Sequence, residues 1–263
     1  MSKKYYFDKS RSVKLNTKKD EETKRFFVSS ICLGQMQIDG EEHHHIANVM
    51  RLSAGDEITL VCNDDFDYHA KILDVNKKFT LVDVYSKVRN QANPKIELTA
   101  FVAVNKNEPM SLMIRMLSEI GVSYFVPFTS KWTASQDAHE KIDRYQKIAD
   151  QSAKQCRRSK TLIVKETQKL DEICKEFHDF DVVFFAYENE DDFCLQDYVK
   201  KYENKTKEHK RIAFVIGPVA GFDVQEAEQI KNSGAVSISL GKRILRADTA
   251  CVSLAYAIME KFE

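Results

Sequence analysis

The stretch FVIGPVAGFDVQEAEQI, residues 214–230, decides how the second half of the chain is interpreted. Its apolar beginning predicts a buried strand that ends at Gly217. A short loop with Gly221 follows, and Asp223 with Glu226 matches the capping box that opens a helix. Because glycine has no Cβ atom, the backbone of this loop can approach a ligand closely. The stretch therefore predicts a strand, a ligand-binding turn and a helix.

A second loop of the same kind is SLGKRILRADTA, residues 239–250. A predicted strand over 236–240 runs into Gly241, and the loop ends where a helix begins near Asp248 or Thr249. In open α/β sheets, ligands bind beyond the carboxyl ends of the strands, where both loops are expected to lie. The Walker and Rossmann spacings are absent, so neither a nucleoside triphosphate nor a dinucleotide is expected.

The pattern along the chain predicts two folded domains. Residues 25–93 contain short strand patterns and one short helix near 41–52, which is typical of a small β-barrel. Residues 94–263 alternate strands and helices, which predicts an α/β domain with a mainly parallel sheet covered on both faces. Residues 1–24 lack apolar periodicity and are predicted to form a flexible basic extension.

The composition bounds the class of protein. Of 263 residues, 43% are hydrophobic and 30% are charged, and the formal net charge is zero. These values predict a globular cytoplasmic protein with local rather than general affinity for phosphate. No apolar run approaches the roughly 20 residues of a membrane span. The six cysteines are widely spaced, and the run His43-His44-His45 points in different directions on a helix, so no metal site is expected.

The two loops together resemble a known family. IGPVAGF and SLGKRILRADTA are similar to the paired cofactor-binding loops of the RsmE-type ribosomal RNA (uracil-N3)-methyltransferases of the SPOUT superfamily. Further matches are RFFVSS, HHIANVMRLSAGDEI, KNEPMSLMIRMLSEIGVSYFVPF and IADQSAKQCRRS. The resemblance thus extends along nearly the whole chain after residue 24.

The resemblance implies a fold and an activity. The fold is a SPOUT domain with a trefoil knot and a mainly parallel sheet, preceded by a PUA-like RNA-binding β-barrel. The activity is methylation of N3 of a uridine in 16S rRNA of the small ribosomal subunit, with S-adenosylmethionine as the methyl donor and a homodimer as the working form. The alternative is a catalytically impaired RNA-binding protein of the same fold.

The resemblance also assigns roles to single residues. For the cofactor they are Glu188, Ile216, Gly217, Pro218, Gly221, Leu240, Gly241, Ile244 and Leu245. Glu188 fits a plain surface acid equally well. Predicted RNA contacts are Arg25, Arg51, Lys106 and Arg158.

Two residues are candidates for catalysis. Arg246 is the predicted cation near the uracil carbonyls, because guanidinium stays protonated and donates hydrogen bonds with fixed geometry. Asp248 is a candidate proton acceptor, although the role of N-cap of the last helix suits it as well.

The sequence departs from the family pattern at a few positions. Val219 and Ala220 replace the usual Glu-Gly, Lys131 and Trp132 replace Glu-Arg, and Met116 replaces a lysine. If residue 220 required positive φ, alanine would cost on the order of 1 kcal/mol relative to glycine. Loss of an arginine and a lysine predicts weaker RNA binding.

Overall fold

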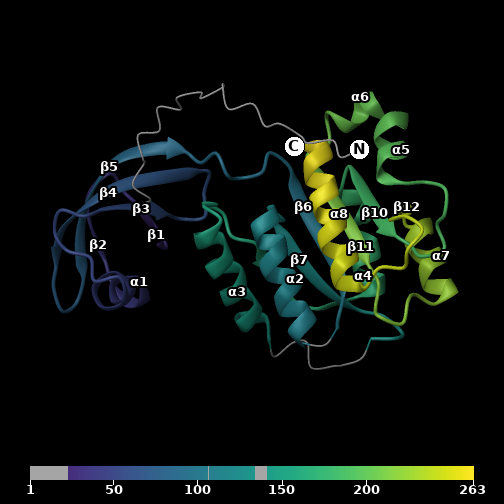
Figure 1. Cartoon of the computed structure of the whole chain (residues 1–263), viewed down its shortest axis with the longest axis horizontal. Helices are drawn as coiled ribbons and strands as arrows, with labels where there is room; N and C mark the ends of the chain where they lie inside the picture. The colour runs from purple at the N-terminus through teal and green to yellow at the C-terminus, as the bar shows by residue number, and fades with distance from the viewer. Residues whose placement is uncertain (1–22, 106, 134–140) are drawn as a thin grey trace, which may run out of the picture.

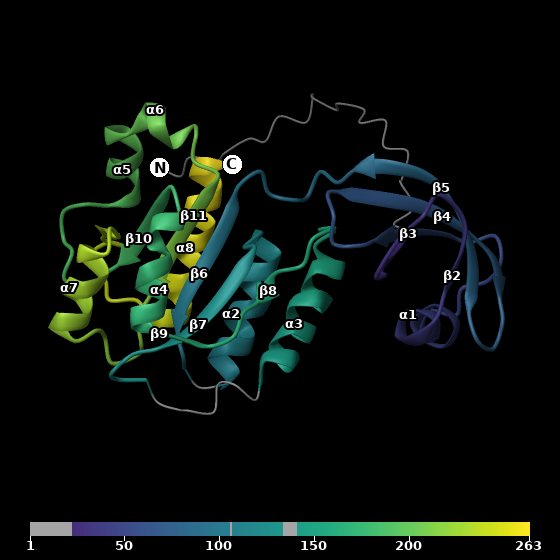
Figure 2. The same ribbon diagram turned by 180° about the vertical axis from the view of Figure 1, so that it is seen from behind.

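The computed structural model describes residues 23–105, 107–133 and 141–263. It places a small β unit beside a larger α/β unit (Figure 1, Figure 2). All but the last two residues of the predicted N-terminal extension, and the candidate RNA contact Lys106, lie outside the described residues.

The small unit is a five-stranded sheet around one apolar core. Its strands are β1 (Lys24–Phe27), β2 (Gly34–Ile38), β3 (Glu57–Val61), β4 (Phe66–Val75) and β5 (Thr80–Arg89), in the order β1-β3-β4-β5-β2. The pair β1 and β3 is parallel and the other pairs are antiparallel. Alternate residues such as Tyr68, Ala70 and Ile72 point into the core. The predicted strand-rich domain is therefore present.

The short predicted helix of this unit has two parts. It consists of α1 (Gly40–His44) and a π-helical turn over His45–Val49. His43 is buried and its Nδ1 lies 2.9 Å from the Thr80 hydroxyl oxygen, whereas His44 is exposed. The three consecutive histidines thus face different surroundings, as the helical geometry predicts.

The larger unit is built on a seven-stranded sheet. Its strands are β6 (Glu97–Ala103), β7 (Tyr124–Thr129), β8 (Ile163–Val164), β9 (Gln168–Lys169), β10 (Val182–Ala186), β11 (Arg211–Ile216) and β12 (Val236–Ile238). The order is β12-β10-β11-β6-β7-β8, with β9 also beside β7, and every strand pair in it is parallel. The predicted parallel α/β sheet is confirmed, although the strand expected over 161–166 pairs only at 163–164. The knot is not resolved by these pairings and stays a prediction.

Helices cover both faces of this sheet. On one face lie α2 (Asn107–Ile120), α3 (Ile142–Gln155), α5 (Leu195–Lys201) and α8 (Ala247–Phe262). On the other lie α4 (Leu170–Glu176), a 3₁₀ turn (Phe177–Asp179) and α7 (Val224–Asn232). The short α6 (Glu203–Thr206) follows α5. Because strand side chains alternate, Phe184 and Phe185 are both fully buried, one in each apolar layer.

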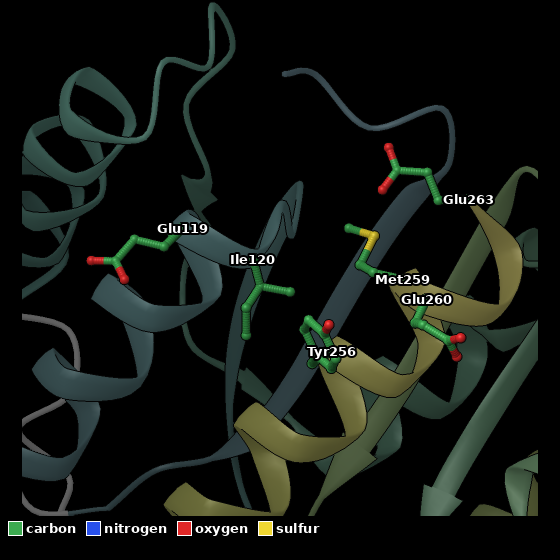
Figure 3. A pocket seen from close by; sticks show the side chains of 6 residues that line it. All are labelled: Glu119, Ile120, Tyr256, Met259, Glu260 and Glu263. Atoms are coloured by element: carbon green, nitrogen blue, oxygen red, sulfur yellow. The ribbon is translucent and has the colours of Figure 1, made fainter. Parts of the chain in front are cut away.

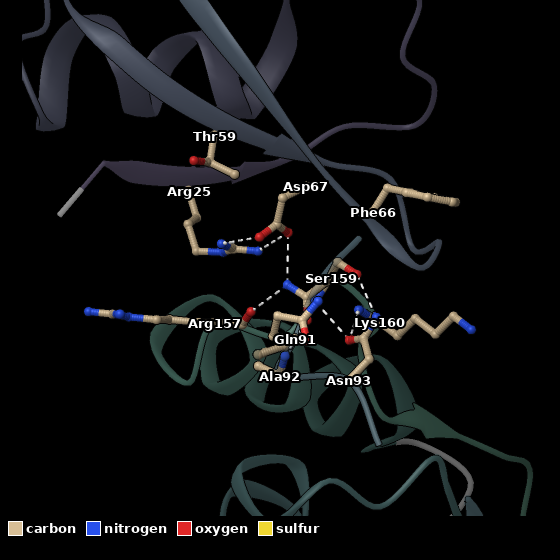
Figure 4. A network of polar contacts seen from close by, with 12 residues as sticks. Arg25, Thr59, Phe66, Asp67, Gln91, Ala92, Asn93, Arg157, Ser159 and Lys160 are labelled. Atoms are coloured by element: carbon tan, nitrogen blue, oxygen red, sulfur yellow. Dashed lines mark hydrogen bonds and ion pairs between the residues drawn. The ribbon is translucent and has the colours of Figure 1, made fainter. Parts of the chain in front are cut away.

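The two units meet through polar side chains (Figure 4). Asn90 donates from Nδ2 to Asp67 Oδ1 at 2.8 Å and to the Arg157 carbonyl at 2.9 Å. Asn93 accepts from the Ser159 N–H at 3.0 Å and donates to the Ser159 hydroxyl at 2.7 Å. The bonds to Arg157 and Ser159 join the domain boundary to the loop after α3, and the bond to Asp67 holds Asn90 to β4 of the small unit, so these asparagines link the two units.

Asn93→Ala is expected to loosen this junction. It leaves the buried Ser159 N–H without its acceptor and removes the Asn93 bond of the Ser159 hydroxyl, which still donates to the Asp64 carbonyl; an unsatisfied buried donor costs about 1–3 kcal/mol of unfolding free energy. Urea unfolding measures the change. The matched control is Gln91→Ala, because the exposed Gln91 side chain donates to the Arg89 carbonyl two residues away. An Asn93→Ala protein as stable as the Gln91→Ala protein would contradict the role given to this junction.

Candidate functional site

Three loops meet at the carboxyl edge of the sheet, the edge where β10, β11 and β12 end. These strands are neighbours and parallel, in the order β12-β10-β11. The loop after β10 carries Glu188 and therefore lies between the loops that begin at Gly217 and Gly241. We name residues 217–221 and 241–246 the two glycine loops. The sheet order thus brings together segments that the sequence separates.

The first glycine loop is a tight turn. The Gly221 N–H donates to the Pro218 carbonyl at 2.9 Å, and Gly221 has φ +77°. A Cβ atom at Gly221 would lie 2.6 Å from Glu188 Oε1, so the carboxylate of Glu188 rests directly against this backbone. Two of the predicted cofactor residues are therefore in contact range, and only glycine leaves room for that contact.

The unusual residues of this turn point outward. Val219 is 84% exposed, and Ala220 is exposed as well. Among the described residues other than glycine, positive φ occurs only at Arg51, Asn63 and Arg157. Ala220 therefore has an ordinary backbone conformation, and the feared cost of alanine at this position does not arise.

The aromatic ring of Phe222 supports the turn from below. A Cβ atom at Gly217 would lie 2.6 Å from the Phe222 ring, so the ring packs on this glycine. Phe222 stacks on Phe128 with 6.2 Å between centroids and meets Phe185 edge-on at 5.3 Å. The turn is thereby anchored to the buried ends of β7 and β10.

Helix α7 begins immediately after this turn and is capped as predicted. Asp223 accepts from the Gln225 N–H at 2.9 Å, and Glu226 accepts from the Asp223 N–H at 3.1 Å. Lys131 uses the other oxygens of both acids: its Nζ lies 2.6 Å from Asp223 Oδ2, and its N–H donates to Glu226 Oε1 at 2.7 Å. The hydrogen bond from the Lys131 ammonium lowers the pKa of the Asp223 carboxyl below its ordinary value. The loop after β7 is thus tied to the first glycine loop.

The second glycine loop is more open. Gly241 has φ +98°, and a Cβ atom there would meet nothing within 4 Å. Ile244 is 90% exposed, whereas Leu240 and Leu245 are half-buried. Two side chains at the first glycine loop are buried, those of Pro218 and of Ile216, the last residue of β11. Both residues therefore present mainly backbone to the carboxyl edge.

Helix α8 begins one residue earlier than expected. Its N-cap position is Arg246, whose side chain is exposed and makes no capping bond. Asp248 lies in the first turn, where its Oδ1 accepts from the Thr249 N–H at 2.8 Å. The N-cap role considered for Asp248 is therefore wrong, and its half-buried carboxylate stands beside the end of the second glycine loop.

The predicted RNA contacts are placed differently from one another. Arg51 is exposed, with φ +53°. Arg25 pairs with Asp67 at 2.5 Å in the junction of the two units. Arg158 is only 3% exposed, and its Nη1 donates to the carbonyls of Ser118 and Val122 at 2.8 and 3.0 Å. Arg158 therefore satisfies the carboxyl end of α2, and its guanidinium does not reach the surface where a phosphate would bind.

A separate pocket of about 490 Å³ lies between α2 and α8 (Figure 3). Its lining residues are Glu119, Ile120, Tyr256, Met259, Glu260 and Glu263. It lies at the carboxyl ends of both helices and so at the opposite edge of the sheet from the glycine loops. Three carboxylates and no cation line the pocket, so it does not suit an anionic nucleic acid. The pocket is also separate from the site at the glycine loops.

The described residues contain no group of three or more His, Cys, Asp or Glu side chains arranged to hold a metal ion. No helix in this part of the chain is long and apolar enough to cross a membrane.

The chain combines a parallel α/β domain, whose loops meet at one edge of the sheet, with a small β unit. Together with two family matches, this arrangement defines a two-domain enzyme that modifies RNA. Residues 91–259 match the model of the RNA methyltransferase domain, and residues 38–85 match the RNA methyltransferase PUA domain. The chain belongs to this RNA methyltransferase family.

Known proteins confirm the resemblance drawn from the two glycine loops. Ribosomal RNA small subunit methyltransferase E of Bacillus subtilis is 27% identical over 217 residues, which are 81% of this chain and 85% of that protein. The protein of the same name from Buchnera aphidicola of Acyrthosiphon pisum is 26% identical over 231 residues, 86% and 87% of the two chains. The crystal structure of the Neisseria gonorrhoeae methyltransferase E, bound to S-adenosyl methionine, has the same fold, with a TM-score of 0.81 at 20% identity over 90% of this chain and 97% of that one.

Sequence reasoning did not find the contact between Lys131 and the cap of α7. The two residues Lys131 and Asp223 are 92 positions apart. In the sequence, Lys131 and Trp132 stand out only as a departure from the family pattern.

Gly221→Ala is expected to destabilise the protein, whereas Ala220→Gly is expected not to stabilise it. Alanine at φ +77° costs about 1–2 kcal/mol and would also displace Glu188. Glycine at residue 220 adds freedom to the unfolded chain and costs about 0.4–1 kcal/mol. Chemical denaturation of both variants measures these changes. A gain in stability from Ala220→Gly would show that residue 220 is strained after all.

Proposed function

We propose that this chain transfers a methyl group from S-adenosylmethionine to N3 of a uridine in 16S rRNA of the small ribosomal subunit. The observation that carries the proposal is the meeting of the two glycine loops around Glu188, with Arg246 at the end of the second loop. The names of the Bacillus and Buchnera relatives and the ligand of the Neisseria structure support it.

The residues at the carboxyl edge fit this methyl donor. Glu188 offers a carboxylate, which accepts hydrogen bonds from ribose hydroxyls, and it is held against the Gly221 backbone. The space beside Gly241 is open, and exposed Ile244 offers apolar surface. When bound, S-adenosylmethionine supplies a methyl group on a positively charged sulfur. The backbone of residues 216–218, with Leu240 and Leu245, completes the proposed binding residues.

The chemistry of uracil explains the need for a cation. N3 of uridine carries an imide proton, so its lone pair becomes nucleophilic only when that proton leaves. The negative charge then spreads over O2 and O4 of the ring. Arg246 is exposed at the entry of α8, and its guanidinium would donate hydrogen bonds to one of these oxygens. Its role is to stabilise the anion and orient the ring, since it does not deprotonate at neutral pH.

Asp248 is the candidate acceptor for the N3 proton. It lies one turn or less beyond Arg246, and its Oδ1 is the atom bonded to the Thr249 N–H. The half-buried carboxylate lies in the first turn of α8, directly after the second glycine loop. Asp248 thereby belongs to the proposed catalytic pair together with Arg246.

The proposal extends to assembly and location. The working form is a homodimer in the cytoplasm, and the domains are the extension 1–24, a PUA-like barrel over 25–93 and a knotted methyltransferase domain over 94–263. Exposed Arg51 supports RNA contact by the barrel, and Lys106 remains a proposed contact beyond the described residues.

The alternative is an RNA-binding protein of the same fold that has lost methyl transfer. Calorimetry with S-adenosylmethionine separates the two, because no binding at millimolar ligand would exclude the enzyme. A deletion strain tests the substrate. N3 methylation blocks Watson–Crick pairing, so reverse transcriptase stops at the modified uridine, and this stop should vanish without the protein. A stop that persists would show that another uridine or another RNA is the substrate.

Arg246→Ala is expected to lower kcat by about 100-fold or more while leaving affinity for S-adenosylmethionine unchanged. The reason is that the guanidinium acts on the uracil anion and not on the cofactor. Methyl transfer to small subunits from a strain lacking the protein gives kcat, and calorimetry gives the cofactor affinity. Arg243→Ala is the matched control, an exposed arginine of the same loop. Unchanged turnover in Arg246→Ala would refute its role.

Asp248→Asn in the same assay examines the proton acceptor. The amide keeps the bond to the Thr249 N–H but is far less basic, so turnover should fall with no loss of stability. A variant with full turnover would leave Asp248 as a first-turn residue of α8 without a catalytic role.

A further inference from the structure

Trp132 stands out on the surface beside the proposed site. It is the single tryptophan of the chain and is 53% exposed. It lies in the turn that follows β7, whose last residue is Thr129. Because the sheet is parallel, this turn is at the same carboxyl edge as the two glycine loops. Neither the family match nor the proposed cofactor site assigns it a role.

The turn that carries Trp132 is fixed on both sides of the ring. On one side, Lys131 is bound through its Nζ to Asp223 and through its N–H to Glu226. On the other, the Thr133 hydroxyl accepts from the Ser130 N–H at 2.6 Å, and the Thr133 N–H donates to the Ser130 carbonyl at 3.1 Å. A single exposed apolar side chain is ordinary on a protein surface. A large aromatic ring next to a ligand loop, on a backbone already fixed by hydrogen bonds, is a different case. Binding there costs little further conformational entropy.

The position of the clamp relates the ring to the methyl-transfer site. Asp223, which binds Lys131, follows the first glycine loop after only Phe222 in the sequence. Trp132 is the neighbour of Lys131 in the same turn. The backbone beside the ring is therefore hydrogen-bonded to the start of α7, which directly follows the first glycine loop.

We infer that Trp132 is a stacking platform for an unpaired base of the substrate RNA, next to the uridine that enters the site. This inference rests on the proposed function. N3 lies on the Watson–Crick edge of uracil, so a uridine methylated there must be unpaired and its neighbours lose stacking partners. Exposed aromatic side chains supply such partners to single-stranded RNA.

The charges around the ring favour RNA over a protein partner. The Lys131 ammonium lies 5.3 Å from the centroid of the Trp132 ring, and its charge is balanced by Asp223. The exposed Lys242 and Arg246 of the second glycine loop add positive charge at the same edge. A stacked base brings a phosphate backbone that these cations neutralise, whereas an apolar protein surface would have to desolvate them.

The single tryptophan makes binding directly observable. Titration of the full chain with a single-stranded oligouridylate should quench the fluorescence of Trp132, because a stacked base contacts its ring. A self-complementary RNA duplex of the same length is the control and should quench much less. Equal quenching by both would overturn the inference, since it would show contact with the RNA backbone rather than with an unpaired base.

Three variants separate stacking from packing. Trp132→Ala should raise KM for small ribosomal subunits by about tenfold, within the range measured for loss of one base stack, with a smaller change in kcat. Trp132→Phe should restore most of the loss, and Trp132→Leu, which is apolar but not aromatic, should not. Val224→Ala removes another exposed apolar side chain beside Asp223 and should leave KM unchanged.

Further readouts distinguish the ways in which the inference can fail. Affinity for S-adenosylmethionine and thermal stability should be the same in all these proteins. If Trp132→Ala instead converts a dimer into a monomer in light scattering, the ring contacts a second copy of the chain and the inference is wrong. If Trp132→Leu restores KM as well as Trp132→Phe, the role is packing and not stacking. A wild-type protein that binds no S-adenosylmethionine fails the proposed function, whichever result the Trp132 variants give.

Discussion

Every strand pair in the described α/β sheet is parallel, and this constraint places the ligand loops. Parallel strands need crossovers through helices, so both faces become covered and the chain reaches the carboxyl edge once per strand. The order β12-β10-β11 then puts the loop of Glu188 between the two glycine loops. Burial of apolar side chains on both faces thus stabilises the sheet. The strand order alone decides which loops become neighbours.

The two units are joined in a different way from the layers of the sheet. Within each unit the core contacts are apolar, as for Phe184 and Phe185, while polar bonds such as those of Asn90 and Asn93 and the ion pair of Lys160 with Asp65 cross the junction. Hydrogen bonds depend on direction more strongly than apolar packing does. The junction therefore joins the two units in a defined direction without merging their apolar cores.

Local sequence patterns predict most of the elements and the two glycine loops, but not the strands β2 and β9. Periodicity predicted the helices and strands, and the capping box of Asp223 and Glu226 is present as expected. Long-range placement was beyond such patterns. Nothing near Arg158 in the sequence indicates that its guanidinium is buried under α2, and nothing near Lys131 indicates Asp223 as its partner. Asp248 fits an N-cap by residue type, but the N-cap position lies two residues earlier, at Arg246, whose side chain caps nothing.

In the turn from Pro218 to Gly221, the shape of the backbone and the identity of the side chains are independent of each other. Its conformation depends on the carbonyl of Pro218 and on the positive φ of Gly221, while the side chains of Val219 and Ala220 extend into water. Selection on backbone shape leaves such outward positions free to vary. Family signatures that demand particular side chains there will therefore pass over members whose binding loop is intact.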